Sequence, residues 1–187
     1  MASPSMSASL LGKVAPGFDH PLDVLEACHV RIAQQCDTLE KLLNHLPSHG
    51  ADVHAQQAAR AVLTYFDTAA VHHHDDEERN LFPLLELANA PGACDLVTSL
   101  TLEHELQGQL WRSLQMQLAR LAAGESSALD ARLTQQFVVA QRRHFEFENA
   151  HILPLARAVL DAPAIARLGR AMAARRVVRF AEAGETD

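Results

Sequence analysis

Apolar residues recur every three or four positions along four long stretches of the chain. This period is typical of helices that bury one face. The stretches run from about 21 to 46, 52 to 88, 94 to 123 and 126 to 160. No segment alternates convincingly between apolar and polar residues, so the pattern predicts no sheet. Short connections between long helices predict an all-α, up-down-up-down four-helix bundle.

Capping residues mark where these helices begin and end. Asp52 is a favourable N-cap for the second helix. Gly124 is a natural residue to end the third helix. Ser126 or Ser127 is expected to cap the fourth helix.

The chain divides into three predicted regions. A flexible tail, rich in Ser and Ala, covers residues 1–18, and the bundle covers 19–160. Asp161 and Pro163 predict the start of a short additional helix, so 161–187 is expected to form that helix and a C-terminal tail.

Each apolar stripe is interrupted near its middle by ionisable residues. Such groups are costly in a core unless they are paired or bind metal, and departures from the packing pattern tend to mark functional sites. Residues 77 and 104 lie at nearly equal distances from the loop at 89–92, which favours one common level in the bundle. The candidate metal ligands are His29, His73, Glu77, His104, His144 and Glu148.

One pattern occurs twice among these residues. The segments 73–83 and 144–154 both read His-x-x-x-Glu, then three residues, two large apolar residues and Pro. A His and a Glu four positions apart share one face of a helix. The neighbouring pair His74/Glu78 is the alternative to His73/Glu77; we prefer the latter because His74 and Glu78 would share a face with Asp67.

Imidazole and carboxylate ligands without thiolate suit iron or manganese, and less selectively zinc. Six ligands are too many for one structural zinc ion, which takes four. The set therefore predicts two iron ions joined by an oxo or hydroxo bridge, with coordination positions open to a small ligand. The outer ring nitrogens are expected to bond carboxylates or carbonyls. Asp76, Glu103 and Glu146 are the candidates.

Net charge, hydropathy and cysteine content limit the kinds of partner and the cellular location that we expect. The formal net charge of −7 argues against nucleic-acid binding, and no apolar run reaches the ~20 residues of a membrane span. Cys28, Cys36 and Cys94 are an odd set without C-x-x-C spacing, which argues against a disulfide framework. A cytoplasmic location is the resulting expectation.

The motifs together resemble the hemerythrin-like family, also called the hemerythrin HHE cation-binding domain, over roughly residues 19–160. They are His29 in Ala-Cys-His-Val-Arg-Ile, the block 73–83, His104 in Leu-Glu-His-Glu-Leu, and His144-x-x-x-Glu148-Asn149. The resemblance implies a four-helix bundle around a non-haem di-iron centre.

One departure from the family bears on function. Oxygen-carrying members have His-x-x-x-His on the third helix and His-x-x-x-x-Asp on the fourth. This chain has Gly108 four residues after His104, and it has Glu148 on the fourth helix. It is therefore more similar to the bacterial and iron-sensing branch, and simple reversible oxygen carriage is not the expected role.

The leading hypothesis is a di-iron protein that binds or senses oxygen, nitric oxide or peroxide. The alternative is a di-iron enzyme that detoxifies nitric oxide or peroxide, or supplies iron for repairing metal centres. No flavin or haem motif is apparent, so any electron donor would be a separate, unidentified partner. A third hypothesis is a helical interaction module that is metal-free or filled with zinc.

Overall fold

The computed structural model describes residues 16–90 and 92–182, and every regular element in these ranges is helical. The predicted tail at 1–18 lies mostly outside them. The first half of the bundle contains α1 (Pro21–His49), α2 (Val53–Asp67), α3 (Ala69–Asp76), η1 (Glu77–Leu81) and α4 (Phe82–Leu87). The second half contains α5 (Ala93–Ala122), α6 (Ala131–Phe147), η2 (Glu148–Ile152), α7 (Leu153–Val159) and α8 (Ala162–Glu182).

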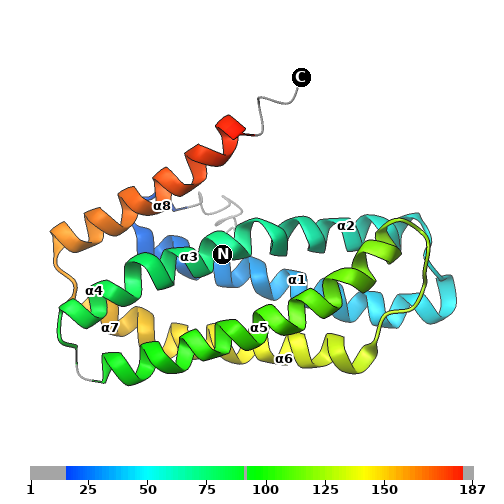
Figure 1. The fold of residues 1–187 in the computed structure, drawn as a ribbon, viewed down its shortest axis with the longest axis horizontal. Coiled ribbons are helices and arrows are strands. Elements are labelled where there is room, and N and C mark those ends of the chain that lie inside the picture. The colour runs from blue at the N-terminus through cyan, green and yellow to red at the C-terminus, as the bar shows by residue number, and fades with distance from the viewer. Residues whose placement is uncertain (1–15, 91, 183–187) are drawn as a thin grey trace, which may run out of the picture.

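These elements form four long helical rods that lie side by side, with α8 across one face (Figure 1). One rod is α1, the second runs from α2 to α4, the third is α5, and the fourth runs from α6 to α7. Each rod contacts two others, because α1 packs on α2 and α6, and α5 packs on the same two helices. The all-helical prediction is confirmed for the described residues, and the arrangement is compatible with a four-helix bundle. No helix among the described residues is long and apolar enough to cross a membrane.

The helix ends follow local capping chemistry, with one correction to the sequence prediction. The Asp52 side chain accepts a hydrogen bond from the Ala55 amide at 2.8 Å, as expected of an N-cap. The fourth rod, however, is capped by Asp130, which accepts from the Leu133 amide at 3.0 Å. Ser126 and Ser127 are therefore not its caps. The periodic pattern extends upstream of the true start, and it cannot show which of several polar residues bonds the first turn.

An additional C-terminal helix follows the four rods within the predicted range 161–187. It has 21 residues, and it packs on α1, α3 and η1. Leu168 and Met172 on α8 are fully buried against the bundle. Gly169 approaches the Phe18 carbonyl so closely that no side chain would fit there. Burial of this face against the bundle stabilises the helix, which begins at Ala162, where Asp161 and Pro163 predict its start.

The core consists of two apolar clusters with a polar layer between them. Ile32, Leu114 and Phe137 belong to one cluster, whereas Leu25 and Leu100 belong to the other. On every rod the predicted His or Glu lies between residues of the two clusters. The bundle therefore places its ionisable residues at mid-height, with apolar packing on both sides.

Candidate metal centre

All six candidate ligands lie in this buried layer. Each exposes 5% of its surface or less, although all are ionisable. They come from all four rods: His29 from α1, His73 and Glu77 from the second, His104 from α5, and His144 and Glu148 from the fourth. The sequence prediction that these side chains share one level agrees with this geometry.

Two imidazoles meet on the α1 side of the layer. The Nε2 atoms of His29 and His73 are 3.1 Å apart. Oxygen Oε2 of Glu148 is 3.2 Å from the His29 Nε2, and Oε1 of Glu77 is 3.4 Å from the His73 Nε2. Two imidazoles at neighbouring positions on one metal, each bonded at about 2.1 Å, place their nitrogens roughly 3 Å apart. This group has the spacing of a metal-binding set.

A second pair of imidazoles meets on the α5 and α6 side. The Nε2 atoms of His104 and His144 are 2.8 Å apart. Oxygen Oε2 of Glu77 is 3.7 Å from the His104 Nε2, and Oε2 of Glu148 is 3.5 Å from the His144 Nε2. Glu77 and Glu148 therefore face both pairs, and both carboxylates belong to two potential metal-binding groups.

The outer nitrogens of three imidazoles are held by polar side chains. The Nδ1 atom of His29 lies 2.7 Å from Asn149 Oδ1, and that of His144 lies 2.9 Å from Glu103 Oε2. The Nδ1 atom of His104 lies 2.6 Å from Glu78 Oε1. When Nδ1–H donates to these oxygens, the Nε2 lone pair faces the centre and is free to bind metal.

Only part of this outer set was predicted from the sequence. Glu103 has the predicted role, whereas Asp76 pairs with arginines on α8 and Glu146 is exposed. Glu78 and Asn149 were missed as partners. Each follows a predicted ligand directly in the chain, so the signal was a polar residue beside Glu77 or Glu148.

The protein alone gives the two buried carboxylates little stabilisation of their negative charge. Burial raises the pKa of Glu77 well above its usual range, and the neighbouring Glu148 raises it further. Burial also acts to raise the pKa of Glu148, but the hydrogen bond with His29 and the charge of His144 lower it overall. Oε2 of Glu77 and Oε1 of Glu148 have no hydrogen-bond partner among the described residues, and Oε2 of Glu148 faces the ring nitrogens of His29 and His144. Buried oxygens in this state fit a site that accepts cations.

The imidazoles are suited to bind metal near neutral pH. Burial lowers the pKa of His104 to about 3, with a further contribution from His144. Burial and the neighbouring His29 lower the pKa of His73 well below its usual range. A metal binds the neutral form of imidazole, so these residues need not lose a proton first.

Each carboxylate begins a π-helical turn. The Phe82 amide donates to the Glu77 carbonyl, and the Leu153 amide donates to the Glu148 carbonyl, in each case across five residues. In both copies the Pro of the repeated pattern comes next and cannot donate a helix hydrogen bond. Such turns are frequent at functional sites. Here they follow directly after the residues that enter the polar layer.

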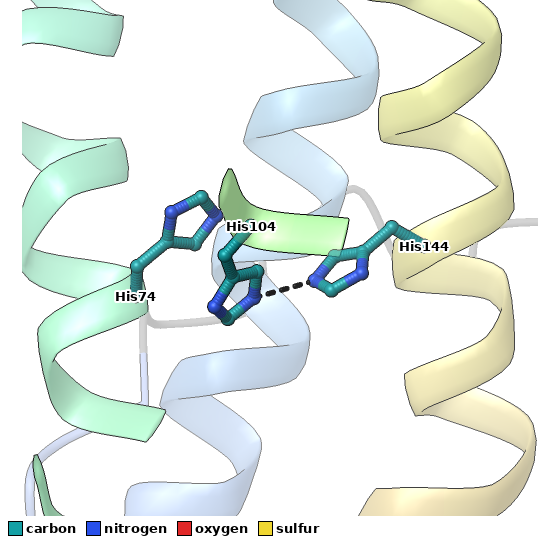
Figure 2. A group of neighbouring side chains, drawn as sticks. All are labelled: His74, His104 and His144. Atoms are coloured by element: carbon teal, nitrogen blue, oxygen red, sulfur yellow. Dashed lines mark hydrogen bonds between the residues drawn. The ribbon is translucent and has the colours of Figure 1, made fainter. Parts of the chain in front are cut away.

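A third histidine accompanies the second pair. His74 of α3 lies beside His104 of α5 and His144 of α6 (Figure 2), and its ring stacks on that of His104. His74 and His104 line a surface cleft of about 410 Å³ together with Gly108 and Arg112. The sequence favoured His73/Glu77 over His74/Glu78, yet His74 and Glu78 both contact His104. The alternative pair therefore also faces the layer, beside the preferred one.

The fold and this layer define a helical metal-binding domain with a His/Glu cluster. The chain belongs to the hemerythrin HHE cation-binding domain family, whose model matches residues 20–156. It is also similar to an uncharacterized protein of Haemophilus influenzae, with 31% identity over 162 residues that span 87% of this chain and 93% of the relative. The family resemblance predicted from the motifs is confirmed.

Proposed function

We propose that this domain holds two iron ions and binds or senses a small molecule: oxygen, nitric oxide or peroxide. His29 and His73 would bind one ion, and His104 and His144 the other. Glu77 and Glu148 would bridge the two. Manganese would also suit these donor atoms, and zinc would bind them less selectively.

The observation that carries this proposal is the shared position of the two carboxylates. Each lies within 4.0 Å of imidazole nitrogens on both sides of the layer. A single cation would leave one imidazole pair and part of each carboxylate without a partner. Two cations use every inward donor atom and offset the buried negative charge.

Access to the layer supports a small ligand. The cleft reaches His104, whereas His29 and His73 are enclosed. Gly108 carries no side chain beside His104, so the approach stays open on the α5 side. Iron bound here would supply open coordination positions and one-electron redox chemistry for such ligands.

The test combines metal content with ligand response. The full chain is loaded with ferrous iron without oxygen, and bound iron is measured by elemental analysis. We expect two irons per chain and an optical change when nitric oxide, oxygen or peroxide is added. Bound iron without any spectral response would rule out the ligand-binding role. Absence of bound metal, with an unchanged melting temperature on adding iron, would favour a helical interaction module instead.

The open cleft also favours a second candidate, an enzyme or an iron supplier. A metal beside His104 would be closer to the surface than one beside His29, and thus more accessible to a reductant or an acceptor. Multiple turnovers of nitric oxide or peroxide with an added reductant would support the enzyme. Transfer of iron to an apo acceptor protein would support the supply role, and neither result is expected of a sensor.

A further inference from the structure

His74 lies on α3 next to His73, but its ring faces the other imidazole pair. Its ring centroid is 3.9 Å from that of His104, and the two planes differ by 13°. The centroid of His144 is 6.1 Å away. One ring nitrogen from each of the three residues lies within 4.8 Å of the other two, so a shared metal is within reach once the stacked His74 ring turns its lone pair towards it (Figure 2).

We propose that His74 is a fifth imidazole ligand, to the metal held by His104 and His144. This inference rests on the proposed metal centre and specifies one of its two positions. The apolar stripe in the sequence gives each helical turn one inward-facing position, and His73 occupies that position. The sequence therefore did not predict His74 as a ligand.

The nitrogens of His74 are available for this role. Within the described part of the chain its ring makes stacking contacts, and neither nitrogen takes part in a hydrogen bond with another residue. His74 is half-buried, and an imidazole nitrogen that makes no hydrogen bond within the protein has a lone pair to offer a metal.

Gly108 explains why there is room for a donor from α3. It lies one turn after His104 and lines the same cleft as His74. A side chain at 108 would project into this region, and its Cβ would meet only Arg112 Nη1, at 3.6 Å. The α5 helix offers no donor atom at this position, and the imidazole beside His104 comes from the neighbouring rod instead.

The consequence is an unequal pair of metal positions. One would have two imidazoles, from His29 and His73, and the other would have three. Both would share Glu77 and Glu148. Because a third nitrogen strengthens binding, the position with His74 should hold its metal more tightly.

Cobalt(II) binding by the full chain tests the proposal without relying on activity. The metal-free protein is titrated with cobalt(II) against a competing chelator, and stoichiometry, two affinities and the visible spectrum are recorded. His74→Phe keeps a stacking ring but removes the nitrogens, and His74→Ala removes both. His72→Phe makes the same change at a histidine outside the three potential metal-binding groups of the described residues. Circular dichroism checks that each variant is folded.

We expect two cobalt ions per chain in the unmodified protein. Both His74 variants should weaken the tighter position by about tenfold or more and change its spectrum, with no change in His72→Phe. His74→Ala combined with Gly108→His should recover much of the lost affinity, because residue 108 can direct an imidazole to the same space. If His74→Phe binds both ions like the unmodified protein, His74 only stacks and the proposal is overturned while the centre stands. If the unmodified protein binds fewer than two ions, the proposed centre fails as well.

Discussion

The two buried carboxylates are in conflict with their surroundings when no cation is present. Glu77 and Glu148 are both at most 1% exposed, and their charges repel each other across the polar layer. The lowered pKa values of His73 and His104 leave these two rings without a positive charge to offset the carboxylates. The same residues that make the empty site unfavourable therefore make it a strong site for cations.

Replacing Glu77 with Gln should separate stability from metal binding. The metal-free variant should be at least as stable as the unmodified protein, because the substitution removes a buried carboxylate that faces Glu148. A metal at a hundred times its dissociation constant stabilises a protein by about 2.7 kcal/mol, and the variant should lose most of this gain. Thermal unfolding with and without cobalt(II) measures both effects. Glu146→Gln, an exposed change on the same rod as Glu148, is the control. An equal metal-induced gain in both variants would contradict the role of Glu77.

The metal-free protein should lose stability as the pH falls from 7 towards 5. Burial and neighbouring imidazoles lower the pKa of His73, His74 and His104, so below about pH 6.5 the unfolded chain takes up protons that the folded chain does not. Stability then rises with pH, by at most about 1.4 kcal/mol per unit for each histidine. The raised pKa of Glu77 acts in the opposite sense, but it is one group against three. Urea unfolding at pH 5, 6 and 7 with chelator present measures the slope, and a flat profile would contradict the assignment.

At the level of helices, the two π turns occupy equivalent places in the repeated pattern. Each begins at the carboxylate, and a new α-helical segment with Pro at its second residue follows. The extra residue in each π turn changes which face of the following helical segment points to the core. Each π turn thus lets its rod direct a candidate metal ligand into the polar layer and still bury Leu81 or Ile152 in the core.

Replacing Pro83 with Ala should weaken metal binding without unfolding the bundle. The alanine introduced by this substitution has an amide that can donate to the Arg79 carbonyl, which favours an α turn over the π turn. The shift should misplace the Glu77 carboxylate and lower metal affinity by about tenfold. Chelator competition measures this affinity. Pro163→Ala, at the second residue of α8, is the matched control and should have no effect. Unchanged affinity in Pro83→Ala would show that the turn does not depend on the proline.

At the scale of the whole molecule, two half-buried arginines connect α8 to a buried aspartate beside the polar layer. Arg175 and Arg176 both bond Asp76, which is fully buried and precedes Glu77 directly in the chain. Arg175 also donates to Asn80 Oδ1 at 2.7 Å. The helix outside the bundle therefore holds the segment that carries Glu77, one of the two carboxylates proposed to bridge the metals.

Removing both arginines should destabilise the whole domain. The double variant Arg175→Ala/Arg176→Ala leaves Asp76 buried without a cationic partner, which typically costs about 3–5 kcal/mol. Urea unfolding measures this loss in the metal-free protein. Arg170→Ala, an exposed change on α8, should have little effect. Adding Asp76→Asn to the double variant should recover part of the stability, and a failure to recover would show that the arginines act by packing alone.

The sequence by itself determined the helical class, the four rods and six of the residues in the polar layer. Helical periodicity reports which face of a helix is buried, so an ionisable residue such as His29 or Glu148 stands out on an apolar stripe. Asp52 and Gly124 could also be assigned to helix ends from the sequence. A capping residue acts on backbone groups within one turn of it, so the local sequence is enough.

Only the tertiary structure decided which side chains meet across the rods. Several of these contacts join residues far apart in the sequence. His74 stacks on His104, Glu78 bonds His104, and Arg175 and Arg176 bond Asp76. Such contacts depend on the rotation and height of each rod, and the pattern along one helix contains neither quantity. The π turns were also visible only in the structure. Each one allows a single rod to direct both a candidate metal ligand and a core residue into the interior.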